Sequence, residues 1–169
     1  EFVECDTVLF SVGLIPETDL IKGVEINSKT NSAIVNEYRE TTMKNVFACG
    51  NVLHVHDLVD YVTKESQLVG KYSALNAICG LNRKKECKIN SGLGVRYTIP
   101  NTYFEGKGNL EILFRVNKKF VKSKVEVLDE KDNVIFSKFI LSASAGEMQS
   151  IEVDKSKLCG NITINMNEV

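Results

Sequence analysis

The first half of the chain mixes two spacings of apolar residues. Residues 6–13 (DTVLFSVG) and 46–50 (VFACG) are nearly continuous apolar runs, a pattern typical of strands covered on both faces. Residues 23–36 alternate around a polar tip, which predicts a hairpin of two short strands. From Leu58 the apolar and small residues recur at helical spacing until Gly80, so we expect one long amphipathic helix there.

The second half reads as strand after strand. Most of its apolar segments alternate with polar residues, and sharp turns rather than helical patterns separate them. This pattern predicts an antiparallel β-sandwich of immunoglobulin-like type. The six expected strands are residues 95–100, 110–116, 121–129, 134–142, 149–153 and 161–166.

Between the halves, residues 80–94 contain glycines and charged residues but show neither helical nor strand periodicity, which is typical of an interdomain connection. We place the boundary at Glu86, so that residues 1–86 form a first unit and residues 87–169 the sandwich. The expected fold class is α+β: a partial α/β unit of strands, a hairpin and one long helix, followed by the sandwich.

Composition excludes several classes of partner. The chain has 169 residues, 43% of them hydrophobic and 25% charged, and its net charge of −1 gives no basic field for nucleic acid. No apolar run approaches the roughly 20 residues of a membrane span, and the acidic start does not resemble a signal peptide, so we expect a cytoplasmic protein. Five widely spaced cysteines without a CxxC motif suit reduced thiols better than disulfides.

The junction at residues 46–61 (VFACGNVLHVHDLVDY) carries the candidate chemistry. A strand that ends in Gly50 and Asn51 and leads into a helix places main-chain N–H groups and a positive dipole end at one spot, which favours an electron-rich oxygen. Gly50 lets a ligand approach the backbone, and the Asn51 side chain can accept from a sugar hydroxyl and donate to a phosphate oxygen. The junction therefore predicts a nucleotide site.

A metal site is the alternative interpretation of the same residues. His54, His56, Asp57 and Asp60 are all possible ligands, and alternate residues of an extended segment point to one side. No third histidine or suitably spaced cysteine supports a metal, so we predict none. The histidines are expected to be the polar lining of a pocket.

The order of these motifs resembles the C-terminal part of the flavin domain in the pyridine nucleotide-disulfide oxidoreductase superfamily. The resemblance is carried by residues 6–20 (DTVLFSVGLIPETDL), 41–51 (TTMKNVFACGN) and 57–74 (DLVDYVTKESQLVGKYSA), and it covers residues 3–78. Thr41 to Gly50 match the second flavin fingerprint, in which Asn51 replaces the usual Asp. Within the superfamily the segment looks most like bacterial FAD oxidoreductases related to a flavoprotein associated with anaerobic glycerol 3-phosphate oxidation.

The resemblance implies an FAD site. Asn51 would contact the ribityl or pyrophosphate region, the backbone around residues 59–61 would point at the pyrimidine edge of the flavin, and Gly13 would lie where the chain crosses between nucleotide domains. Replacing Asp by Asn51 keeps an acceptor and removes a charge, which would shift the flavin potential upward. The residues expected to bind the cofactor are Gly13, Gly50, Asn51, Val52, His56, Asp57, Leu58, Val59 and Asp60.

Other parts of such an enzyme are missing from this sequence. No GxGxxG motif follows a strand, and the redox-active cysteine pair of the disulfide reductases is absent. We therefore expect a C-terminal fragment, inactive by itself, of an FAD-dependent oxidoreductase that exchanges hydride with NAD(P)H bound by absent domains.

No catalytic residue is assigned. His56 and Asp57 are candidates for a proton donor or acceptor near the flavin, and Asp57 is equally suited to cap the helix. The alternative function is a sandwich module for homodimerisation or for docking a partner subunit.

Overall fold

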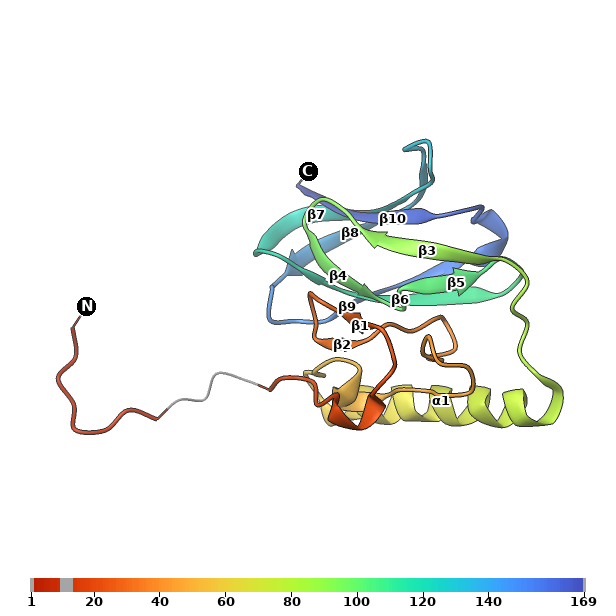
Figure 1. The fold of residues 1–169 in the computed structure, drawn as a ribbon. Coiled ribbons are helices and arrows are strands. Elements are labelled where there is room, and N and C mark those ends of the chain that lie inside the picture. Colours follow the sequence, from red (N-terminus) through yellow and green to blue (C-terminus); the bar gives the residue numbers. More distant parts are fainter. Residues whose placement is uncertain (1, 10–13, 169) are drawn as a thin grey trace.

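The computed structural model describes residues 2–9 and 14–168, and it stacks the two halves of the chain in layers. Figure 1 shows the β-sandwich on one side, the long helix on the other, and the loops of residues 22–58 between them. Residues 2–9 extend away from these layers. The sandwich is thus seated against the segment that carries the candidate site.

The sandwich consists of two β-sheets. The five-stranded sheet has the order β5-β3-β10-β7-β8, and the three-stranded sheet has the order β4-β6-β9. Their strands are β3 (Glu86–Ser91), β4 (Val95–Ile99), β5 (Thr102–Phe104), β6 (Asn109–Val116), β7 (Phe120–Leu128), β8 (Val134–Ala143), β9 (Gln149–Asp154) and β10 (Ile162–Glu168). A short 3₁₀ turn, η3 (Lys155–Lys157), precedes β10.

One hydrophobic core lies between the two sheets. Alternate residues of β6, β7 and β10 point inward, and Phe114, Val125 and Ile164 are completely buried there. Burying each such side chain contributes roughly 1.5–3 kcal/mol to the stability of the fold. Because successive side chains of a strand point to opposite faces, the period-two pattern of the sequence identifies the residues of this core.

All six strands expected from the sequence are present, as β4 and β6 to β10. Two further strands were missed: β5 has only three residues, and β3 falls in the charged segment that we interpreted as a connection. The expectation of a purely antiparallel sandwich is wrong at one place, because β3 pairs parallel with β10. The immunoglobulin-like type and the domain boundary at Glu86 remain predictions.

The first half contains less regular structure than expected. The hairpin is confirmed as β1 (Ile26–Asn27) paired antiparallel with β2 (Ser32–Ala33). The expected strand over residues 6–13 is wrong for its described part, since residues 6–9 form no strand and Leu9 is 92% exposed. Residues 46–50 make only one isolated bridge, between Glu40 and Phe47. An apolar run becomes a buried strand only beside partner strands, and the described residues supply none here.

The long helix is confirmed as α1 (Val59–Cys79), with Gly80 just after its end. Its first residue follows Leu58, which occupies the N-cap position, so the alternative of Asp57 as helix cap is wrong. Two 3₁₀ turns, η1 (Asp19–Ile21) and η2 (Gly50–Val52), complete the first half. None of the helices in the described part of the chain is long and apolar enough to cross a membrane.

Packing and charge join the two halves. Ala33, Val35 and Leu53 form a second hydrophobic cluster with Tyr97 and Ile99 of β4. Nearby, Lys155 of η3 forms a buried ion pair with Glu37, at 2.8 Å between Nζ and Oε2. The N–H of Phe104 also donates to Glu37 Oε1. The sandwich therefore holds the loops that lead into α1.

Candidate functional site

Gly50 and Asn51 form the turn at the junction. Gly50 has a φ of +71°, a conformation that side-chain-bearing residues rarely adopt, and its N–H donates to Glu65 Oε2 at 2.8 Å. Asn51 is exposed, and its Oδ1 accepts the main-chain N–H of His56 at 3.3 Å. The side-chain NH₂ group of Asn51 still offers two donors to a ligand.

The start of α1 lies open beside this turn. Leu58, Val59 and Asp60 are exposed, and Val59 is exposed by 75%. The first N–H groups of a helix lack partners within the helix and carry a partial positive charge. The N–H of Tyr61 donates to the carbonyl oxygen of Leu58, so within the helix the N–H groups of Val59 and Asp60 are the ones left without a partner.

Asp57 connects the junction to the sandwich. Its Oδ1 accepts from Arg115 Nη2 of β6, and its Oδ2 accepts the N–H of Met148 at 2.6 Å. Arg115 also donates to the carbonyl oxygen of Val55, at 2.9 Å. These contacts fix residues 55–57 from outside the junction, so the Asp57 carboxylate is already paired.

A buried charge cluster lies beneath the turn and was not foreseen from the sequence. Glu65 projects from α1 toward Arg39, whose Nε lies 3.2 Å from Glu65 Oε1. His56 Nε2 lies 2.8 Å from Glu65 Oε2, and His54 Nε2 lies 3.7 Å from Glu65 Oε1. The rings of His54 and His56 are 4.0 Å apart between centroids. All four side chains are at most 3% exposed.

The surroundings of this cluster shift two pKa values. Burial raises the pKa of Glu65, but the two histidines and Arg39 outweigh that effect and hold the pKa well below its usual range. Burial lowers the pKa of His54, and the nearby carboxylate only partly opposes it. Glu65 is therefore ionised and His54 neutral near pH 7.

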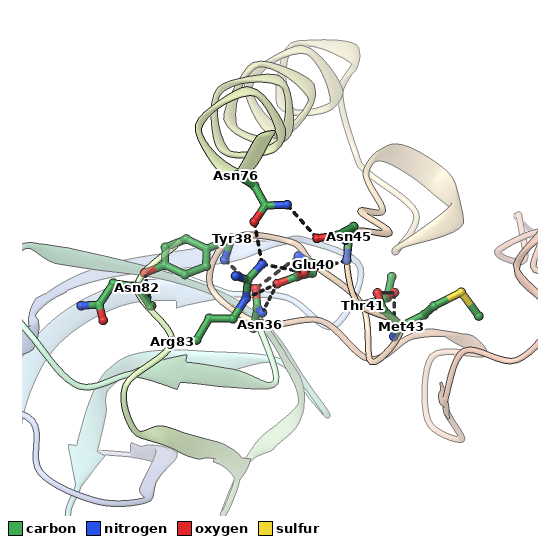
Figure 2. Close-up of polar contacts among 9 residues, drawn as sticks. All are labelled: Asn36, Tyr38, Glu40, Thr41, Met43, Asn45, Asn76, Asn82 and Arg83. Carbon is green, nitrogen blue, oxygen red and sulfur yellow. Dashed lines mark hydrogen bonds and ion pairs between the residues drawn. The ribbon is translucent and has the colours of Figure 1, made fainter. Parts of the chain in front are cut away.

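A second polar cluster braces the far end of α1 (Figure 2). Arg83 makes two hydrogen bonds to Glu40, at 2.8 and 2.9 Å, and one to Asn76 of α1 at 2.8 Å. Asn76 in turn donates to Asn45, whose N–H donates to Glu40 Oε1. Because every polar side chain of this chain of contacts is paired, we assign it a structural role.

The structure brings part of the expected site together. Asn51, the main chain of His56 and the start of α1 are neighbours, whereas the His56 side chain turns inward to Glu65 and Asp57 turns to the sandwich. Val52 is half-buried, and Gly13 lies outside the described residues. Sequence reasoning missed Arg39, Glu65 and Arg115, because their roles depend on how distant elements pack.

Comparisons with known proteins give two partial matches. Residues 1–69 match the family described as pyridine nucleotide-disulphide oxidoreductase. The chain is also 33% identical over 84 residues to an NADH-rubredoxin oxidoreductase of Clostridium acetobutylicum. Both findings are partial similarities to redox proteins, and they support an oxidoreductase-related role. The second match covers 47% of this chain and 21% of the relative, so the chain spans about a fifth of the relative's length. No solved structure gives a significant match.

Proposed function

We propose that this chain is part of an FAD-dependent oxidoreductase that exchanges hydride with NAD(P)H. The observation that carries the proposal is the family match over residues 1–69, which includes the junction and the first half of α1. The name of the NADH-rubredoxin oxidoreductase agrees with nicotinamide-linked redox chemistry. FAD would supply the hydride chemistry, and this chain would supply part of its binding surface.

The geometry of the junction supports a contact with FAD. The exposed Asn51 amide would bind a sugar hydroxyl or phosphate oxygen, and the N–H groups of Val59 and Asp60 at the start of α1 would face the pyrimidine carbonyls of the flavin. The N–H of Gly50 is already used by Glu65, so its contribution is the turn itself. Val52, His56, Asp57, Leu58, Val59 and Asp60 would shape this surface chiefly through the main chain.

We further propose that the chain is inactive by itself and is a C-terminal fragment of a larger, cytoplasmic bacterial enzyme. Within α1, all of which the structure describes, Glu65 is the only buried residue, while Val59, Tyr61 and Ile78 are exposed. Such a helix suits a surface that further domains cover. The cysteines are all free thiols, which is typical of a reducing compartment.

The test is flavin binding by the full reading frame that contains this chain. Asn51→Leu should lower FAD occupancy, measured by visible absorbance after purification, while Asn117→Leu at an exposed turn of the sandwich should leave it unchanged. The 169-residue chain alone should bind FAD weakly or not at all, because most nucleotide contacts would be missing. A colourless full-length protein would overturn the proposal.

One observation favours the second candidate, an interaction module. β8 is an edge strand of the five-stranded sheet, and it exposes Phe139 by 54% and Leu141 by 68% beside the exposed Val121 of β7. An open edge with apolar side chains is suited to pairing with a partner subunit or a second copy. If it is an interface, sedimentation should show association that Phe139→Lys abolishes without any effect on flavin binding.

A further inference from the structure

The buried cluster of His54, His56 and Glu65 has an unusual feature: one of its histidines lacks hydrogen-bond partners. Both ring nitrogens of His54 are buried and make no hydrogen bond among the described residues. The residue is only 1% exposed. A buried polar group without a partner costs roughly 1–3 kcal/mol, so an unpaired imidazole needs an explanation.

The spacing of the ligand atoms supplies one. One nitrogen from each histidine and one oxygen of Glu65 all lie within 4.8 Å of one another. The 3.7 Å between His54 Nε2 and Glu65 Oε1 is too long for a hydrogen bond. It is close to the separation of about 3.4 Å between two atoms that bind one metal tetrahedrally at about 2.0–2.1 Å each.

The contacts around Glu65 orient it as a ligand. Arg39 donates to Oε1 and the Gly50 N–H donates to Oε2, which together fix the plane of the carboxylate. Partners that hold a ligating carboxylate in place are the usual surroundings of protein metal sites. The positive charge of Arg39 opposes a bound cation. Glu111 supplies a second carboxylate nearby, because it lines a cavity of about 190 Å³ together with Arg39, His56 and Glu65.

We propose that His54, His56 and Glu65 bind one divalent transition-metal ion of the zinc type. Two imidazoles and one carboxylate are one of the ligand sets found in zinc sites with three protein ligands, with a fourth position for water. In the metal-bound state His56 exchanges its hydrogen bond to Glu65 for coordination, and His54 gains the partner that it lacks. Asp57 is paired with Arg115 and Asp60 is exposed, and neither belongs to the cluster of ligand atoms.

Cavities lie on both sides of the cluster. His56 and Glu65 line the cavity between α1 and the three-stranded sheet, and His54 lines a separate cavity of about 580 Å³ together with Tyr97 and Arg115. The ion would thus sit between the turn at Gly50 and the sandwich, where it would lock the two halves together. This inference concerns the chain without flavin, so it stands or falls independently of the proposed function.

The sequence permits a test that needs no substitution. The chain contains only two histidines, so their ring ¹⁵N signals report directly on the cluster. Adding Zn²⁺ to the metal-free chain at neutral pH should shift the signals of both rings, with saturation at one ion per chain. Unchanged histidine signals, or a shift of one ring only, would overturn the proposal.

Substitutions then identify the ligands. Titration with Co²⁺ should give ligand-field bands without intense thiolate charge transfer, and Zn²⁺ should displace the Co²⁺. His54→Phe and His56→Phe should weaken binding by about 100-fold or more, because losing a ligand should exceed the roughly 10–100-fold effect of losing an outer-shell partner. Both variants keep the pair between Arg39 and Glu65, and circular dichroism checks their folding.

Two controls separate the site from general metal binding. Glu147→Gln removes an exposed carboxylate in a turn of the sandwich, and the combined Cys5→Ser, Cys79→Ser and Cys159→Ser variant removes the exposed thiols. Both should bind Co²⁺ as the unaltered chain does. Loss of binding in either control would assign the metal to other groups and overturn the proposal.

Discussion

Glu65 is a buried carboxylate on which three other groups depend. It is the counter-charge of Arg39 and accepts from both Gly50 and His56. Glu65→Gln would leave Arg39 buried without its ion-pair partner, and breaking such a pair costs about 3–5 kcal/mol. We expect the free energy of unfolding, measured in urea, to fall by that amount, whereas Glu147→Gln should change it by less than about 0.5 kcal/mol. Equal losses in the two variants would contradict the structural role of Glu65.

The same cluster sets a pH dependence. His54 has a lowered pKa in the folded chain, whereas its pKa in the unfolded chain is about 6.5. Below pH 6.5 the unfolded state therefore binds more protons than the folded state. Stability should therefore fall from pH 7 to pH 5, with a slope of at most about 1.4 kcal/mol per pH unit. Glu65 also has a lowered pKa, so its contribution is complete above about pH 4.5 and is lost at lower pH. Denaturation in urea at several pH values should show both ranges, and His54→Phe should flatten the upper one and also weaken the lower one, because His54 helps to lower the pKa of Glu65.

Single residues were predicted where local rules apply. Gly50 was predicted from the sequence as a close-approach glycine and Asn51 as a polar contact; the structure gives Gly50 a positive φ and leaves Asn51 exposed, while their contact with a cofactor stays a prediction. The partner of the histidines was not recognised, since Glu65 lies nine residues after His56 and only the packing of α1 brings it back under the turn. A buried acidic residue within an amphipathic helix looks, in sequence, like part of its solvated face.

Among the elements, α1 depends on the brace at its C-terminal end. Arg83→Met would remove the bidentate partner of Glu40, whose pKa Arg83 helps to lower despite burial (Figure 2). Asn36 and Asn45 would still donate to Glu40, so we expect a loss of about 1–3 kcal/mol rather than unfolding. Thermal unfolding measures the loss, and Lys84→Met at the adjacent exposed position is the matched control. A larger effect of Lys84→Met would contradict the assignment.

Elements with a clear period were predicted correctly, and those without one were not. The alternation in β6, β7 and β10 locates these strands because their inward side chains form the core, and the helical spacing after Leu58 locates α1 although Glu65 is its one buried residue. Residues 6–9 and 46–50 were interpreted as buried strands from apolar content alone, which says nothing of the neighbouring strands that a ladder requires. β3 was missed because its charged residues point outward from an otherwise regular strand.

At the scale of the whole molecule, Arg115 links the sandwich to the junction. Arg115→Leu would remove the donors to Val55 and Asp57, while β6 would keep its place in the core. Amides of residues 54–57 should then exchange with solvent deuterium roughly tenfold faster or more, which corresponds to a loss of about 1.4 kcal/mol of local stability. Arg96→Leu on the exposed side of β4 is the control. Unchanged exchange in Arg115→Leu would show that the sandwich does not hold the junction.

The position of β10 limits the order in which the protein is built. β10 lies at the centre of the five-stranded sheet, and it alone joins the β5–β3 pair to the β7–β8 hairpin. A nascent polypeptide can form that hairpin as soon as it leaves the ribosome. The edge of β3 that pairs with β10, however, stays unpaired until residues 162–168 have been translated. The sandwich is thus completed only after translation has passed β10, and chaperones would meet its open halves before then.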